Sequence, residues 1–200
     1  ALYQPLTVGE HPGQQVSIFV SSGDRTKLMS GSPSIDNHLI AINDANYPSG
    51  DGPDSYETLD DFTDRSDLTS QCTGSSSNGS WSRALSDRSK AASAPVLGYG
   101  NLYNTLHKPL DVDSCALGAS RLEVVDYECG SLKQTVDLGT GVATQATLYR
   151  GKVYVGLADN GVDLELPVGW KRFDSLVVGA TPETRSFINK PIAIKGWWRE

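Results

Sequence analysis

The chain has 200 residues, of which 38% are hydrophobic, and a formal net charge of −7 at pH 7. This hydrophobic content is enough for one sizeable core or two small ones. The acidic balance argues against nucleic acid or an anionic membrane surface as the main partner, because both attract basic patches. No segment approaches the roughly 20 apolar residues of a membrane-spanning helix, so we expect no membrane span in this chain.

The first part of the chain predicts two strands and one long insertion. The apolar run Val16 to Val20 and the segment His38 to Asp44 predict strands. Residues 45–80 are poor in aliphatic side chains, rich in Asp, Ser and Gly, and too long for an ordinary connection. We therefore expect a surface insertion, with one helical turn around residues 56–62, inside a single β-rich domain that covers residues 1–200.

The centre of the chain predicts closely spaced strands. Gly98-Tyr99-Gly100-Asn101 is typical of a tight hairpin turn between two apolar runs. From Ser114 to Asn160, alternating side chains and frequent turn residues predict a β-meander. Its four strands are expected at residues 121–127, 133–139, 144–150 and 152–158. Meanders of this kind recur in the blades of β-propellers.

Two further strand-like pieces, residues 174–180 and 191–200, follow the meander. Twenty glycines and ten prolines favour turns over long helices. The predicted fold class is therefore all-β, with nine to twelve strands in antiparallel meanders that resemble part of a β-propeller, together with the long irregular insertion.

Three cysteines cannot all pair within one chain. The internal options are Cys72–Cys115, Cys72–Cys129 and Cys115–Cys129. We favour Cys115–Cys129, which would join the entry of one strand to the turn that ends it. The closed loop of about 15 residues would contribute on the order of 3 kcal/mol in the chain-entropy model. The alternative is three reduced, buried thiols in a cytoplasmic protein.

The order of these segments resembles the C-terminal region of the type IV pilus tip-associated adhesins, the PilC/PilY family. The resemblance lies in SIFVSSGDR (Ser17 to Arg25), HLIAIND (His38 to Asp44), GSWSRALSDRSK (Gly79 to Lys90) and CALGASRLEVVDYECG (Cys115 to Gly130), and in the final GWWRE. The last of the long motifs departs from the family pattern. Ala119 replaces a glycine, Glu123 an aromatic residue and Cys129 a threonine.

The resemblance implies a non-enzymatic cell-surface protein that acts in pilus assembly, tip capping or adhesion. Those adhesins are much longer, and this chain holds about three blades' worth of strands, so we expect a partner chain that completes its sheets. Pilin or other pilus subunits are the first candidates, and a host or surface ligand is another. The chain could also be a globular filament subunit paired with a short helical pilin. The expected location is the extracellular cell surface (fimbrium), after export through the periplasm.

Ala1 opens no basic and apolar leader pattern. For an exported protein, we therefore expect either that a signal peptide has been removed or that the chain is the back end of a longer precursor.

The resemblance also implies calcium, because the family carries Asp-x-Asn-x-Asp loops and Ca²⁺ takes six to eight oxygen ligands. Candidate ligands are Asp44, Asn46, Asp51 and Asp54. A second acidic cluster lies in the same insertion, at Asp60, Asp61, Asp64 and Asp67. The alternative is a solvated acidic loop that holds no metal.

Catalytic motifs are absent from the sequence, so we expect no enzyme. His11, His38 and His107 have no Cys or His at ligand spacing, which argues against a zinc site. There is no Gly-x-Ser-x-Gly elbow and no glycine-rich phosphate loop. A quinoprotein docking motif would keep Asp126 and Gly130 but lacks its Thr and Trp.

The aromatic residues have two interpretations. Trp81, Trp170, Tyr99, Tyr103 and Tyr154 could form an exposed recognition patch, or fill the core between sheets. Trp197 and Trp198 are the candidate partner interface, because adjacent strand residues point to opposite faces and cannot both enter one core. The competing function is a stand-alone secreted β domain that binds carbohydrate or another ligand on these aromatic side chains.

Overall fold

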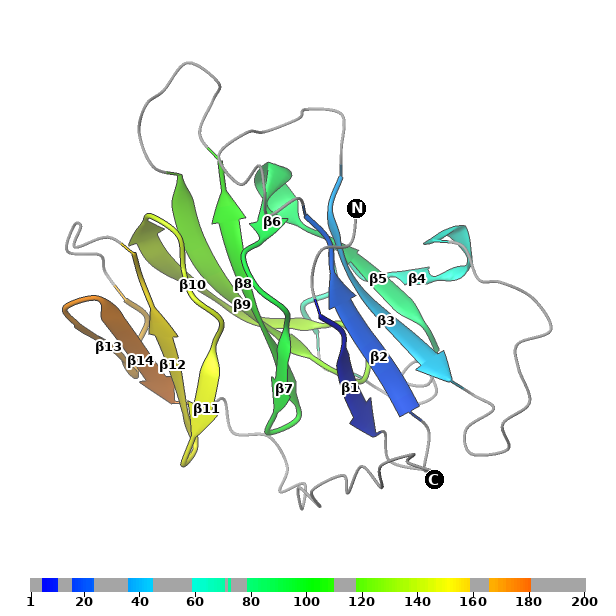
Figure 1. Cartoon of the computed structure of the whole chain (residues 1–200). Helices are drawn as coiled ribbons and strands as arrows, with labels where there is room; N and C mark the ends of the chain where they lie inside the picture. Colours follow the sequence, from blue (N-terminus) through cyan, green and yellow to red (C-terminus); the bar gives the residue numbers. More distant parts are fainter. Residues whose placement is uncertain are drawn as a thin grey trace, which may run out of the picture.

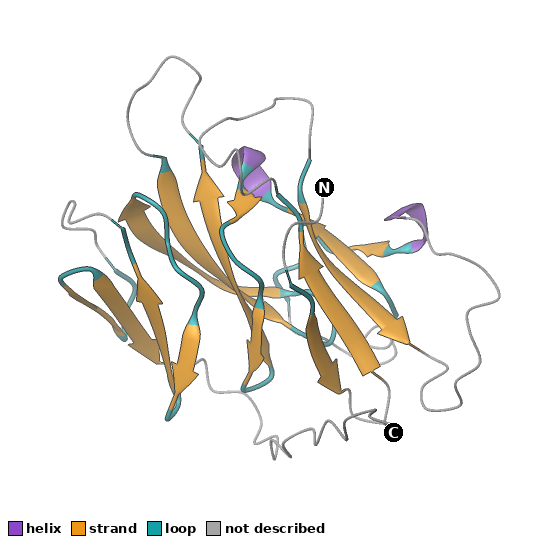
Figure 2. Cartoon of the chain, viewed as in Figure 1, coloured by secondary structure: helices purple, strands orange, loops and turns teal. Residues whose placement is uncertain are grey.

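The computed structural model describes residues 5–10, 16–23, 36–44, 59–70, 72, 79–109, 118–158 and 166–180. These residues form three β-sheets, and the faces of neighbouring sheets pack against each other (Figure 1). Strands and their connecting turns dominate, with two short 3-10 turns at Leu59–Asp61 and Ser86–Arg88 (Figure 2). None of the described segments forms a helix long and apolar enough to cross a membrane.

Sheet one has the strand order β1-β2-β3-β5-β4. These strands are β1 (Thr7–Glu10), β2 (Val16–Ser21), β3 (His38–Asp44), β5 (Trp81–Ala84) and β4 (Thr63–Asp64). The first four are antiparallel neighbours, and the short β4 pairs parallel with β5. β4 comes from the predicted insertion, so this part of that segment belongs to the sheet.

Sheet two lies in the middle and has the order β10-β9-β8-β6, with β7 also paired to β8. Its strands are β6 (Lys90–Ala91), β7 (Val96–Gly98), β8 (Asn101–Lys108), β9 (Ala119–Asp126) and β10 (Leu132–Thr140). The long β8 pairs along one edge with both β6 and β7, and along the other with β9. β9 and β10 form an antiparallel hairpin with two register shifts.

Sheet three has the order β11-β12-β14-β13. It contains β11 (Thr147–Tyr149), β12 (Lys152–Gly156), β13 (Trp170–Phe173) and β14 (Leu176–Ala180). All neighbours are antiparallel. β14, the second strand of the β13–β14 hairpin, pairs with β12. β13 therefore lies at the edge of the sheet.

Two tight hairpins have left-handed backbone at both central residues. Tyr99 and Gly100 have φ values of 50° and 71°, which confirms the hairpin predicted at residues 98–101. Arg150 and Gly151 repeat this geometry between β11 and β12, with φ values of 48° and 71°. Two-residue turns of this type match the right-handed twist of paired strands and therefore fix their register.

Sheet two is buried on both faces. Side chains of β9 alternate, so that Leu122 and Val124 pack towards sheet three while Val125 packs towards sheet one. Trp170 belongs to the core between sheets two and three. Trp81 packs with Phe19 and Tyr127 in the core between sheets one and two. A strand covered on both faces has a nearly continuous apolar sequence, and this accounts for the run LEVV in β9.

The predicted fold class is confirmed, since the described residues form antiparallel β-meanders with almost no helix. Strands predicted from alternation occur at β2, β3, β9, β10, β12 and β14. The described residues already hold fourteen strands, so the predicted nine to twelve was too low. The helical turn expected around residues 56–62 is a 3-10 turn at Leu59–Asp61. The strand-like segment at residues 191–200 lies outside the described residues.

Candidate partner-binding surface

The disulfide links Cys72 with Cys129, at a Cα–Cα distance of 5.9 Å, and this corrects the favoured pair Cys115–Cys129. The favoured pair is ruled out by the length of β9, which separates its two ends. Seven residue steps from Ala119 to Asp126 span about 24 Å, and a bond from Gly130 N to Asp126 O holds Cys129 at the far end. Cys115 precedes Ala119 by four residues, a reach of at most about 14 Å. Cys115 itself lies outside the described residues.

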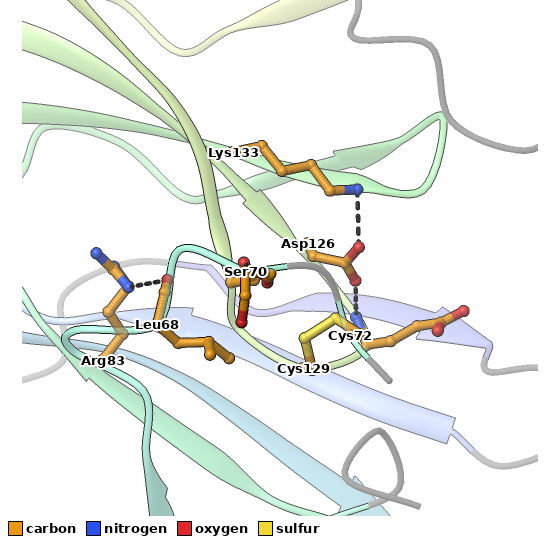
Figure 3. The surroundings of a disulfide bond; sticks show 9 residues. Leu68, Ser70, Cys72, Arg83, Asp126, Cys129 and Lys133 are labelled. Atoms are coloured by element: carbon orange, nitrogen blue, oxygen red, sulfur yellow. Dashed lines mark hydrogen bonds and ion pairs between the residues drawn. A yellow bond between two sulfur atoms is a disulfide. The ribbon is translucent and has the colours of Figure 1, made fainter. Parts of the chain in front are cut away.

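The disulfide anchors a segment that we call the strap, residues 65–70 and Cys72 (Figure 3). The strap bonds to both neighbouring sheets. Arg65 N donates to Ser82 O on β5 (2.8 Å), whereas Leu132 N on β10 donates to Leu68 O (2.9 Å). The Arg83 guanidinium donates from Nη1 to Arg65 O and Leu68 O, at 2.7 and 3.3 Å. The strap therefore joins sheet one to sheet two.

Of the calcium candidates, only Asp44 lies in the described residues; it is exposed at the end of β3, and Asn46, Asp51 and Asp54 fall outside them. Asp60, Asp61, Asp64 and Asp67 are all exposed. Asp64 accepts hydrogen bonds from the hydroxyl and backbone N–H of Ser66, which lower the pKa of its carboxyl.

The one described group of three metal-ligand side chains within 4.8 Å is Cys72, Asp126 and Cys129. Two of these form the disulfide. The Asp126 carboxylate bonds to Lys133 Nζ (2.7 Å) and to Glu128 N (2.9 Å). The sulfurs are therefore bonded to each other, and both carboxylate oxygens accept from donors within the protein.

The described tryptophans fill the cores. Trp81 is 1% exposed and Trp170 is 7% exposed. Each lies against a glycine, because a Cβ atom on Gly130 or Gly179 would overlap the indole ring. Tyr103 is fully buried. The predicted interface residues Trp197 and Trp198 lie outside the described residues.

A cluster of charged side chains is buried between sheets one and two. Arg121 Nη2 lies 3.1 Å from Glu123 Oε1 on β9. Burial raises the pKa of the Glu123 carboxyl, and the guanidinium groups of Arg121 and Arg83 oppose this rise. Arg83 is itself buried, and burial lowers its pKa. Arg83 comes from sheet one and Glu123 from sheet two, so their attraction acts across the interface between these sheets.

His107 and Ser120 form a buried pair that sequence reasoning did not bring together. His107 Nδ1 lies 3.4 Å from Ser120 Oγ and 3.2 Å from Gly141 O. The Ser120 hydroxyl donates to Gly141 O (2.7 Å) and accepts from Ala143 N (3.0 Å). Because both side chains are buried and this hydroxyl proton is held by a carbonyl, the pair fixes the turn after β10 and does not present an accessible nucleophile.

The buried imidazole predicts a pH dependence of stability. Burial lowers the pKa of His107 below its usual 6.5, with a smaller downward effect from Lys90 and an opposing one from the Gly141 carbonyl. Between the folded-state pKa and 6.5 the unfolded chain binds a proton that the folded chain does not. The stabilisation from neutral His107 is thus present above about pH 6.5 and is lost as pH falls through the folded-state pKa.

This dependence is measured by urea unfolding of the unchanged chain and of His107→Asn at pH 7.5 and 5.0. The unchanged chain is expected to lose more stability on acidification than the variant, which lacks this titrating group. Equal losses in the two proteins would contradict the prediction.

The outer faces of sheets one and three expose large apolar side chains. On sheet one, Val8, Ile18 and Ile42 lie opposite one another across β1, β2 and β3. Val8 is 52% exposed and Ile42 is 37% exposed. Their chain neighbours Phe19 and Ala41 point into the core, so this row points away from it. We call Val8, Ile18 and Ile42 the outer row.

Sheet three carries a different outer face. Phe173 and Leu176 lie opposite each other on β13 and β14, and are 59% and 37% exposed. Tyr149, which is 56% exposed, lies opposite Lys152, and the Arg150 guanidinium lies 5.1 Å above the centre of its ring. Charged side chains therefore interrupt this face. On sheet one, the exposed carboxylates of Glu10 and Asp44 lie two residues beyond Val8 and Ile42, so the outer row is an apolar patch bordered by negative charge. No protein-family model, curated protein or solved structure matches the chain.

Proposed function

We propose that the chain is a non-enzymatic, extracellular assembly module of the type IV pilus system. It acts by docking a partner on the outer face of sheet one, either in pilus assembly, tip capping or adhesion, or as a globular filament subunit paired with a short helical pilin. The observation that carries the docking role is the outer row of sheet one, an apolar surface with three aligned aliphatic side chains. The assignment to the pilus system rests on the sequence resemblance.

The physical argument starts from the cost of leaving this row in water. Val8 and Ile42 are one third to one half exposed, and Ile18 is partly exposed. Covering the three side chains would contribute on the order of 3 kcal/mol, since full burial of an aliphatic side chain contributes roughly 1.5–3 kcal/mol. An aligned apolar row on the outer face of a sheet is a surface that a partner can cover without rearranging the chain.

Location outside the cytoplasm is supported by the Cys72–Cys129 disulfide, since such bonds form and persist mainly in oxidising compartments. The strap that it anchors ties sheet one to sheet two, so the bond also holds the sheet that carries the outer row. An exposed filament component benefits from such a covalent tie because it cannot be refolded by cytoplasmic chaperones.

The test is mass spectrometry of sheared surface filaments from the source cells and from a strain that lacks the main pilin. Peptides such as VYVGLADNGVDLELPVGW are expected in the filament fraction only when pilin is present. Changing Ile42→Lys should lower their amount at least tenfold, because a charge would be buried under the partner. Val168→Lys is the matched control, since Val168 is fully exposed in a turn and lies apart from the outer row.

Equal peptide amounts in the soluble fraction of both strains would contradict the pilus assignment. Retention of Ile42→Lys in filaments at the level of the unchanged chain would contradict docking through the outer row.

A further inference from the structure

One strand from each sheet, β1, β7 and β11, lies at the contact with the next sheet, in chain order (Figure 1). Between sheets one and two, the Thr7 hydroxyl donates to Pro95 O. Beside this bond, Gly9 on β1 lies directly under Leu97 on β7, so closely that a Cβ atom on Gly9 would overlap Leu97 Cδ2. The glycine is therefore a recess that receives the leucine of the next sheet.

The same contact recurs between sheets two and three. A Cβ atom on Gly98 of β7 would overlap Leu148 Cδ1 of β11. Gly151 N also donates to the Tyr99 hydroxyl across this interface (2.9 Å). At each of the two interfaces, a glycine of the earlier strand thus faces a leucine of the later one, and β7 contributes a residue to both interfaces. These residues of β7 are Leu97 and Gly98.

The repeat identifies what each end of the stack lacks. On β1, Val8 precedes Gly9 just as Leu97 precedes Gly98, and Val8 points outward with 52% of its surface exposed. Within the described part of the chain, Val8 is therefore an aliphatic side chain with no glycine opposite it. On β11, the residue that follows Leu148 is Tyr149, where β7 has Gly98 after Leu97. The Tyr149 side chain takes the space that a leucine from another sheet would need.

The two ends are consequently not equivalent. Tyr149, with Arg150 stacked on its ring and Lys152 opposite it, closes the outer face of sheet three. Among the described residues, no aromatic side chain lies over the outer row of sheet one. A second copy cannot continue the stack head to tail, because its sheet three would present Tyr149 to Val8 instead of a glycine.

We propose that the outer face of sheet one binds an antiparallel β-sheet of a partner polypeptide, whose edge strand carries a glycine that receives Val8. This inference rests on the proposed docking function and specifies the partner: a twisted sheet with an apolar inner face, stacked about 10 Å from sheet one as packed sheets are. Its continuity with the two interfaces already in the molecule distinguishes it from a helix or a loop, which would not reproduce the glycine recess.

The experiment gives the chain the feature that the partner must have. Tyr149→Gly opens a recess on sheet three, so the variant should associate head to tail with the outer row of another copy. Tyr149→Ala is the matched control, because a Cβ atom at Gly9 or Gly98 would overlap the leucine methyl group that lies against it. Sedimentation velocity at 1–500 µM, a range of about three decades in concentration, measures the association of each protein, and circular dichroism and urea unfolding confirm that each is folded.

The expected result is a monomer for the unchanged chain and for Tyr149→Ala, and a concentration-dependent oligomer for Tyr149→Gly. Adding Ile42→Lys to Tyr149→Gly should return the protein to a monomer. A Tyr149→Gly chain that stays monomeric would overturn the inference, and so would association that Ile42→Lys leaves intact. Self-association of the unchanged chain through Ile42 would also overturn it, since the occupant would then be a second copy.

These outcomes are independent of the pilus assignment. Filament retention that depends on Ile42, together with a monomeric Tyr149→Gly, would leave the docking function in place and remove only the glycine-bearing β-sheet as the partner. Failure of pilin dependence, together with an associating Tyr149→Gly, would remove the pilus assignment and leave the glycine-bearing β-sheet as the partner.

Discussion

Changing Cys72→Ser is expected to lower the free energy of unfolding by about 4 kcal/mol. The bond joins residues 57 positions apart, and the chain-entropy model gives about 4 kcal/mol for a closed loop of this length. Since single domains are typically stable by about 5–15 kcal/mol, this is a large share of the total. The measurement is urea unfolding of the oxidised protein, the reduced protein and the variant.

Cys115→Ser is the matched control, because Cys115 is not part of the disulfide. This variant should unfold at the same urea concentration as the unchanged chain, and reduction should destabilise both equally. Peptide mapping without reduction should recover the Cys72 peptide linked to the Cys129 peptide. A linked Cys115–Cys129 peptide, or destabilisation by Cys115→Ser alone, would show that the pairing is wrong.

The strands that could be predicted are those whose side chains alternate or whose turns are tight. β2, β3 and the β9–β10 hairpin follow from apolar periodicity, and the β7–β8 hairpin follows from Gly98-Tyr99-Gly100-Asn101. β4 and β6 could not be predicted, because each has two residues and exists only through pairing with a longer neighbour. β1 has four residues and gives no clear alternation.

The disulfide was mispredicted because the favoured pair joined the entry of a strand to the turn that ends it, across a short loop, without allowing for the length of that strand. The shortest loop favoured Cys115, whereas the rigid length of β9 separates the two ends of that loop. A strand predicted between two cysteines is itself evidence against their pairing, and this signal was present in the sequence. The role of Cys72 was obscured because residues 45–80 were treated as surface, although the strap within them bonds to both neighbouring sheets.

The candidate surface was only partly accessible from the sequence. Alternation places Ile18 and Ile42 on the face opposite Phe19 and Ala41, but it does not say which face lacks a covering sheet. That depends on the order in which the three sheets stack. The significance of Gly9 and Gly98 was likewise hidden, because an isolated glycine in a strand indicates a close approach without identifying the approaching group.

Gly130→Ala is expected to destabilise the protein by about 2–5 kcal/mol, for two separate reasons. Gly130 has a φ of +75°, and left-handed backbone costs a residue with a Cβ atom roughly 1–2 kcal/mol. The added methyl group would also lie 2.7 Å from Trp81 Cε3 and 2.8 Å from Trp81 Cδ2, in a fully packed core. Overpacking of this kind typically costs about 1–3 kcal/mol.

Gly151→Ala separates the two effects, because Gly151 has nearly the same φ, +71°, and nothing lies within 4 Å of its Cβ position. This variant should therefore show the backbone cost alone, about 1–2 kcal/mol. The difference between the two variants in urea unfolding measures the contact with Trp81, and Gly130→Ala in a Trp81→Leu background should recover part of it. Equal destabilisation by the two alanines would mean that Trp81 does not pack tightly against the turn after β9. It would then also contradict the packing of this turn, which contains Cys129, against sheet one.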